Sequence, residues 1–174
     1  MPIYGATFRG STMHGSEAIH LSEFDLKIIS ALQADGRRSN TEIARELQVA
    51  ESTVRRRLDW LVKSGVIQVM AITDPLKVGF PVWIIGQLEI EVGKVEAVVQ
   101  KLERLTEVTF IAITTGSFDV LFTAIFRSTT DLYSFLSGPL SGIGHIRKIE
   151  TSLVLRLAKR RFQGPPISQN RMTE

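Results

Sequence analysis

The sequence has 174 residues, of which 44% are hydrophobic and 22% charged, with a formal net charge of +3. This composition is typical of a soluble globular protein, and no stretch has the roughly 18 consecutive apolar residues that a membrane helix needs. The absence of cysteine excludes disulfides and cysteine-ligated metals, and the three histidines are scattered, so we expect no metal, no cofactor, no membrane contact and a cytoplasmic location.

The first part of the chain predicts three short helices. Ser22 is a candidate N-cap for a helix over Glu23–Ala34, and Ser39 or Asn40 caps a second helix over Asn40–Leu47. A third helix is expected over Glu51–Ser64, where Gly65 ends it. Short helices with a tight turn between the second and the third are the layout of a helix-turn-helix.

A connecting region follows the third helix. Apolar runs at Val66–Ile67 and Val69–Ile72 predict a pair of short strands, which together form the wing of a winged helix-turn-helix. Asp74-Pro75 interrupts this pattern, and Gly79-Phe80-Pro81 marks a second turn. The sequence therefore predicts a first domain over residues 21–74 and a linker over residues 75–82.

The second half alternates strand and helix patterns. Strands are expected over Val82–Val92, Val108–Ile113, Phe118–Phe126 and Ile146–Leu157, and helices over Lys94–Leu105 and Thr129–Leu140. The order βαββαβ predicts a ferredoxin-like domain over residues 83–160 and hence an α+β fold class. Residues 1–20 and 161–174 lack such patterns, and we expect flexible tails there.

The predicted third helix separates apolar from basic side chains. At about 100° per residue, its apolar residues, among them Val54 and Leu61, lie on one side, and Arg56 and Lys63 lie opposite. Arginine suits guanine edges and phosphates because its planar fork donates parallel hydrogen bonds. The prediction of DNA binding depends on this local cluster and not on the overall charge, because residues 1–75 hold 9 basic and 9 acidic side chains and so have a net charge of zero. The helix is therefore predicted to bind duplex DNA.

The predicted DNA contacts form three groups. The side chains expected to enter the major groove are Ser52, Thr53 and Arg56. The side chains expected to contact phosphate are Arg38, Arg55, Arg57 and Lys63. Backbone N–H groups at the start of the second helix offer a further phosphate site, around Ser39, Asn40 and Thr41.

These segments resemble a known family. "LSEFDLKIISALQADGRRSNTEIARELQVAESTVRRRLDWLVKSGVI" and the exit "DPLKVGF" resemble the N-terminal domain of the Lrp/AsnC (feast/famine) transcriptional regulators, and "VTFIAITTGSFDVLFTAIF" and "GHIRKIETSLVL" resemble their effector domain. The resemblance covers about Leu21 to Arg161. It implies a sequence-specific DNA-binding regulator rather than an enzyme. Such proteins dimerise through their C-terminal sheets, often assemble further to octamers, and bind a small effector, by default an amino acid, that tunes assembly and DNA binding.

The same resemblance places the effector site at the loop "TTGSFD". Gly116 permits a tight turn, backbone N–H groups around Gly116–Phe118 are expected to hold a carboxylate, and Asp119 is expected to pair with an α-ammonium group. The implied contacts are Thr114, Thr115, Gly116, Ser117, Phe118, Asp119, Leu136 and Thr151. The alternative is an ordinary hairpin turn in which Asp119 caps local backbone. The chain departs from the family pattern at Ala50, where a serine cap is frequent, and at Ile149, where a threonine is frequent.

Two other functions remain open for this architecture. One is an enzyme like the siroheme decarboxylases, which need histidine and basic residues around a tetrapyrrole, and here the second domain offers only His145. The other is an oligomeric metabolite-binding module with a vestigial helix-turn-helix. A Soret-region absorbance scan tests the first. Salt-dependent DNA binding tests the second, because log K falls by ~0.9 per neutralised phosphate for each unit of log salt.

Overall fold

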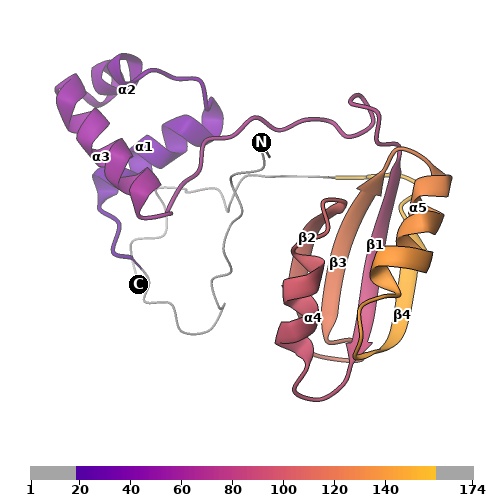
Figure 1. The fold of residues 1–174 in the computed structure, drawn as a ribbon. Coiled ribbons are helices and arrows are strands. Elements are labelled where there is room, and N and C mark those ends of the chain that lie inside the picture. Colours follow the sequence, from indigo (N-terminus) through magenta and orange to yellow (C-terminus); the bar gives the residue numbers. More distant parts are fainter. Residues whose placement is uncertain (1–18, 160–174) are drawn as a thin grey trace. The chain divides into compact units, whose positions relative to one another are not determined.

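The computed structural model describes residues 19–159, which form two compact units that divide between Ala71 and Ile72 (Figure 1). Apart from Ile19 and His20, the predicted tails over residues 1–20 and 161–174 lie outside the described residues. Among the described helices, none combines the length and the apolar character required to cross a bilayer.

The first unit contains three helices, α1 (Glu23–Ala34), α2 (Asn40–Leu47) and α3 (Glu51–Lys63). The predicted bounds of the first two are confirmed, and α3 ends one residue early because Ser64 is its C-cap. Local capping sets the helix starts. The Ser22 hydroxyl accepts from the Asp25 N–H at 3.3 Å, and the Ser39 hydroxyl accepts from the Glu42 N–H at 3.2 Å.

A small apolar core holds the three helices together. Ile28 of α1, Ile43 of α2, and Val54 and Leu61 of α3 are fully buried. Gln48 lies between α2 and α3 with a φ of 56°, in the left-handed region, and so turns the chain sharply enough for the two helices to pack. This is the predicted helix-turn-helix.

The predicted strand pair after α3 is not formed, because the described chain has no strand between Lys63 and Val82. The N–H groups of Val66 and Ile67 both donate to the Leu61 carbonyl, at 3.0 and 3.3 Å, and their side chains pack against the helical core. These residues therefore close the end of α3 and are not available to pair with a second strand. Val69 and Ile72 remain exposed.

The second unit is a four-stranded antiparallel sheet with the strand order β2-β3-β1-β4. Its strands are β1 (Val82–Ile90), β2 (Val108–Ile113), β3 (Val120–Phe126) and β4 (Ile146–Leu153), and its helices are α4 (Val95–Leu102) and α5 (Thr129–Phe135). The predicted βαββαβ order and the α+β, ferredoxin-like class are confirmed.

Five predicted elements of this unit are shorter than expected. The first strand ends at Ile90, the first helix spans Val95–Leu102, and the third strand begins at Val120. The other two end early for reasons that the structure shows. The helix predicted over Thr129–Leu140 becomes a π-helix over Leu136–Leu140, which contains Pro139. Proline has no N–H group to continue the α-helical ladder. The strand predicted to reach Leu157 ends at Leu153, because Leu153 pairs with Ile84 near the start of β1 and the residues beyond Val154 have no partner strand.

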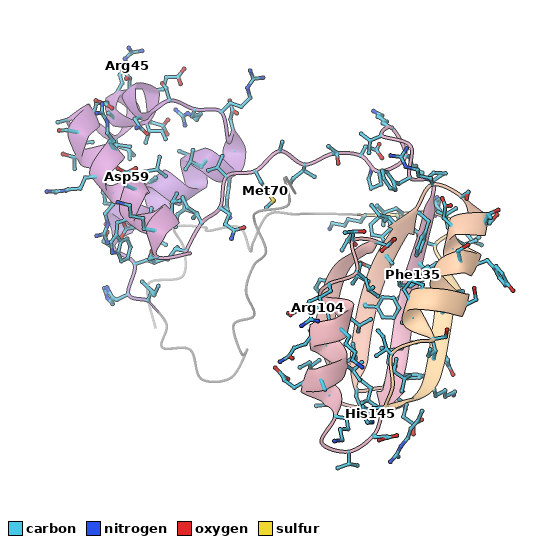
Figure 2. All side chains as sticks on the ribbon, viewed as in Figure 1. Arg45, Asp59, Met70, Arg104, Phe135 and His145 are labelled. Atoms are coloured by element: carbon cyan, nitrogen blue, oxygen red, sulfur yellow. The ribbon has the colours of Figure 1, made fainter. Side chains whose placement is uncertain are left out.

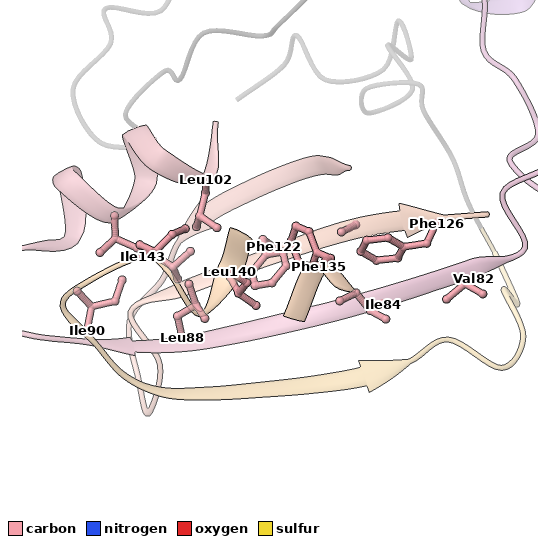
Figure 3. Packing of buried hydrophobic residues seen from close by; sticks show 13 residues of the cluster. Val82, Ile84, Leu88, Ile90, Leu102, Phe122, Phe126, Phe135, Leu140 and Ile143 are labelled. Carbon is pink, nitrogen blue, oxygen red and sulfur yellow. The ribbon is translucent and has the colours of Figure 1, made fainter. Parts of the chain in front are cut away.

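The helices α4 and α5 cover one face of the sheet (Figures 1 and 3). Ile84 and Leu88 of β1 and Phe122 of β3 point into this core and are at most 1% exposed. Gly86 leaves room for the Phe122 ring, because a Cβ atom at Gly86 would lie 2.1 Å from it. On the opposite face, Ile85 is 38% exposed and Phe110 is 53% exposed, so residues 19–159 of one subunit leave this face without a covering layer.

Candidate nucleic-acid interface and effector site

The helix α3 has a buried side and an open side. Val54 and Leu61 are fully buried against α1 and α2. The other side carries a hollow of about 410 Å³, lined by Ser52, Arg55, Arg56, Asp59, Trp60 and Lys63. Residues three or four positions apart share one face of a helix, so the hollow follows a single face. Four of the predicted DNA contacts, Ser52, Arg55, Arg56 and Lys63, are brought together there.

Two cations on this face are available to a partner. Arg56 and Lys63 are exposed, and within residues 19–159 neither forms an ion pair. Thr53 is half-buried, and its N–H donates to the Ala50 carbonyl at 3.0 Å. Ala50 gives α3 no side-chain cap, as its residue type predicts.

Arg55 has a partner on its own helix. Its guanidinium donates to the two carboxylate oxygens of Glu51 at 2.6 and 2.7 Å, and the Arg55 side chain is 62% exposed. The hydrogen bonds with Glu51 are the main cause of a raised Arg55 pKa, and the charge of Asp59 adds a smaller effect. Exposed pairs of this kind are weak, so a phosphate can compete with Glu51 for Arg55.

Arg57 is used inside the domain rather than on the open face. Its Nε and Nη2 atoms donate to the carboxylate of Asp25 on α1, the second at 2.7 Å, and Asp25 is fully buried. The same guanidinium lies 4.1 Å from the ring centroid of Trp60. The sequence predicted a phosphate contact for Arg57, whereas in the folded domain its anionic partner is Asp25.

The Asp25 carboxylate also receives hydrogen bonds from Ser22. The backbone N–H and the hydroxyl of Ser22 donate to Oδ2 of Asp25 at 2.7 and 2.6 Å. The hydrogen bond from Arg57 is the largest cause that lowers the pKa of Asp25, which falls to about 2 despite its burial. Asp25 is therefore ionised at neutral pH and joins the first turn of α1 to the middle of α3.

The start of α2 is partly occupied. Ser39 and Glu42 bond each other reciprocally, which uses the N–H groups of both residues. Within residues 19–159, no hydrogen bond occupies the N–H groups of Asn40 and Thr41. Arg38, from the preceding turn, forms an ion pair with Glu46, and its side chain is 25% exposed.

Asp59 and Trp60 also line the hollow, although the sequence analysis gave neither a role. The signal that identifies them is their spacing, because Asp59 lies three residues after Arg56 and Trp60 lies four residues after it. The exposed indole of Trp60 lies against the guanidinium of Arg57, which is itself paired with the buried Asp25.

The loop between β2 and β3 closes on itself. The N–H of Thr114 donates to the Asp119 carbonyl, its hydroxyl donates to the Phe118 carbonyl, both at 2.9 Å, and Gly116 has a φ of +116°. Among the described residues, the N–H groups of Thr115 to Phe118 donate to no protein acceptor. This loop thus presents consecutive free donors, which suits an anion such as a carboxylate.

Within the described residues, the side chain of Asp119 has one hydrogen-bond partner. Its Oδ2 accepts from the N–H of Ile90 at 2.7 Å, where the pairing of β1 and β4 shifts register. Its Oδ1 has no hydrogen bond within residues 19–159.

The other predicted effector contacts lie elsewhere in the subunit. Thr151 of β4 pairs with Gly86 of β1, and Leu136 packs against the core. Neither makes a hydrogen bond to the loop within the described chain. Lys148 of β4, which the sequence analysis did not select, lies 5.5 Å from the Phe118 ring centroid and 2.6 Å from the Glu150 carboxylate.

Comparisons with known proteins agree with this two-part architecture. A family model described as winged helix-turn-helix DNA-binding matches residues 21–68, and one described as the Lrp/AsnC ligand binding domain matches residues 85–163. An HTH-type transcriptional regulator of Pyrococcus furiosus is 39% identical over 140 residues, which cover 80% of this chain and 95% of that protein. The regulator Ptr1 of Methanocaldococcus jannaschii is 36% identical over 140 residues, again 80% of this chain and 95% of that protein.

Solved structures share the fold. AsnC of E. coli superposes with a TM-score of 0.76 at 26% identity, covering 84% of this chain and 99% of that chain. The transcriptional regulator NMB0573 of Neisseria meningitidis, solved in complex with L-Met, has the same TM-score and identity and covers 84% of this chain and 97% of its own. On its sequence, its fold and these relatives, the chain belongs to the Lrp/AsnC family of transcriptional regulators.

Proposed function

We propose that this regulator binds duplex DNA through the open face of α3. Ser52, Thr53 and Arg56 enter the major groove, and Arg38, Arg55 and Lys63 contact phosphates, together with the N–H groups of Asn40 and Thr41. The observation that carries this proposal is the exposed Arg56, which forms no ion pair within the described part of the chain and lies on the side of α3 opposite the buried Val54 and Leu61. Arg57 is left out of the phosphate contacts, because its partner Asp25 is fully buried, whereas the partners of Arg38 and Arg55 reach the surface, where a phosphate can replace them.

Replacing Arg56 by alanine tests this role. We expect the variant to lose roughly 1–3 kcal/mol of specific binding, the typical contribution of a bidentate contact to guanine. Arg45→Ala is the matched control, because Arg45 is exposed on α2 and does not line the hollow (Figure 2). Equal affinities of the Arg56 variant and the unchanged protein for a selected site would contradict the contact.

Salt dependence tests the DNA-binding function as a whole. Each neutralised phosphate makes log K fall by ~0.9 per unit of log salt, so several contacts predict a steep slope. A flat response would favour the metabolite-binding module with a vestigial helix-turn-helix. We propose no catalytic role for this chain. We propose a cytoplasmic location, because that is where a DNA-binding regulator would reach its target.

We further propose that the loop over Thr114–Asp119 binds an amino acid. The N–H groups of Thr115 to Phe118 donate hydrogen bonds to its carboxylate, and Oδ1 of Asp119 accepts from its α-ammonium group, since Oδ2 already accepts from the Ile90 N–H. Leu136 and Thr151 lie away from this loop in the same subunit. We propose that they join the site where a second subunit packs against the first. The relative from Neisseria meningitidis, solved with L-Met, supports an amino acid as the ligand class.

Asp119→Asn separates the charge of Asp119 from its structural bond. Asparagine keeps an oxygen for the Ile90 N–H but loses the charge that attracts an ammonium group. An amino acid at 100 times its Kd is expected to stabilise the unchanged protein by about 2.7 kcal/mol and the variant far less, whereas Asp131→Asn, on α5, responds normally. An equal thermal shift in the Asp119 variant would exclude this role.

The uncovered sheet face supports assembly. A second copy of the chain, packed through the face that carries Ile85 and Phe110, would remove these apolar side chains from water. We propose a homodimer of this kind, with further assembly to an octamer. Sedimentation velocity distinguishes the monomer, dimer and octamer.

A further inference from the structure

Asp59 occupies an unusual place for an acidic residue. It lies on α3 (Figure 2), and it is the acid among the six residues that line the hollow. It is exposed, three residues after Arg56 and four before Lys63, so its carboxylate lies on the same face as these cations. A surface that meets DNA is expected to avoid negative charge, because phosphates repel it.

The other described acids of the first unit are engaged. Their partners are Lys27 for Glu23, Arg57 for Asp25, the Arg37 N–H for Asp35, Ser39 for Glu42, Arg38 for Glu46 and Arg55 for Glu51. Within residues 19–159, no hydrogen bond or ion pair occupies the Asp59 carboxylate. Its charge contributes to the raised pKa of Arg55 less than Glu51 does, so no hydrogen bond or ion pair within these residues explains its position.

A free carboxylate in this position discriminates between sequences. It lowers affinity for every duplex through repulsion, and only a hydrogen-bond donor on a base edge offsets that loss. In the major groove the exocyclic amino groups of cytosine and adenine are such donors. Aspartate suits cytosine, because the amino group of adenine stands beside the N7 acceptor and is read by side chains that both donate and accept. Arg56, one turn earlier, carries the complementary chemistry, because arginine donates to guanine.

We propose that Asp59 is a specificity-determining residue that accepts a hydrogen bond from the N4 amino group of a cytosine, in the base pair next to the one that Arg56 contacts. This inference rests on the proposed DNA-binding function of α3. It adds a base-reading residue of opposite charge to a face that otherwise attracts any duplex.

Site selection from a randomised duplex pool tests the proposal, with the full-length protein, Asp59→Ala and Asp35→Ala at one fixed salt concentration, because alanine removes the acceptor oxygens as well as the charge. Asp35→Ala is the matched control, since it removes the same carboxylate from the same unit away from the hollow. We expect sites selected by the unchanged protein and by the control to share a cytosine that the Asp59 variant does not retain. Replacing that base pair is expected to weaken the unchanged protein roughly 5- to 150-fold, and the variant by less than about 2-fold. Asp59→Glu, which keeps a carboxylate, is expected to retain the cytosine.

Two results separate this inference from the proposed function. If Asp59→Ala selects the same bases at every position, whether or not it binds all duplexes more tightly by one factor, Asp59 reads no base and the inference is wrong, while DNA binding stands. If the unchanged protein binds no duplex in a salt-dependent manner, the proposed function itself is wrong, and the role of Asp59 is overturned with it.

Discussion

Removing the charge of Asp25 is expected to loosen the whole helix-turn-helix. Asp25 is fully buried, and its carboxylate holds both the guanidinium of Arg57 on α3 and the N–H and hydroxyl groups of Ser22. Asp25→Asn keeps the shape of the side chain but leaves Arg57 without its anion. The Arg57 guanidinium also lies 4.1 Å from the ring centroid of Trp60, which lines the open face of α3. We therefore expect the effect to reach that face.

The magnitude follows from the pKa of Asp25. Lowering this pKa from 3.8 to about 2 corresponds to about 2 kcal/mol of folding free energy at neutral pH. Breaking a buried ion pair by removing one partner costs about 3–5 kcal/mol. The Arg57 side chain is 34% exposed and so can reach water after the substitution. We therefore expect Asp25→Asn to destabilise the first unit by about 2–3 kcal/mol.

The pH dependence has a definite sign. A carboxyl group whose pKa is lower in the folded state stabilises the fold above its unfolded value, near pH 4, and this stability is lost as the pH falls toward 2. The unchanged protein is thus expected to lose stability between about pH 4 and pH 2, and the variant to lose about 2 kcal/mol less over that range.

Urea unfolding of the full-length chain, with amide hydrogen exchange of α1 and α3, measures these effects. Glu23→Gln is the control, because Glu23 pairs with Lys27 on the surface of the same helix and is expected to matter little. Equal stability of Asp25→Asn and the unchanged protein at pH 7, or parallel losses of stability below pH 4, would refute the buried ion pair as a source of stability.

Three further substitutions test separate parts of the fold. Gly86→Ala places a Cβ atom 2.1 Å from the Phe122 ring and is expected to destabilise the second unit by roughly 1–3 kcal/mol or more. Thermal unfolding measures this effect. Gly144→Ala is the control and is expected to be neutral, because a Cβ atom there would lie within 4 Å of no atom outside the neighbouring residues. Ala50→Ser supplies the missing cap of α3 and is expected to add about 0.5–1 kcal/mol in urea unfolding. Ile85→Lys puts a charge on the open sheet face and is expected to shift the sedimentation coefficient toward the monomer; an unchanged value would exclude this face as the dimer interface.

Local features of the sequence were enough to predict most elements. The bounds of α1 and α2 follow from Ser22 and Ser39, whose caps involve residues only three positions away. The two sides of α3 follow from helical periodicity alone, as does the grouping of Ser52, Arg55, Arg56 and Lys63 on its open face. Even the missing cap at Ala50 was visible from the residue type.

Contacts between distant residues were not predictable in this way. Arg57 and Arg56 are neighbours of the same type, and nothing local indicates that only Arg57 meets a buried carboxylate 32 positions away. The strand pair after α3 failed for a similar reason, because Val66 and Ile67 bond to Leu61 and pack on a core built from all three helices.

What the sequence determined by itself is therefore the order of helices and strands, their caps and the polarity of each face, since these depend on residues within one or two turns. The tertiary structure alone decided which cation is neutralised, which acid is left free, and why β1 needs a glycine opposite Phe122. These features depend on which side chains folding brings within a few ångströms of each other. The number of residues between two side chains in the sequence does not predict their distance in the folded protein.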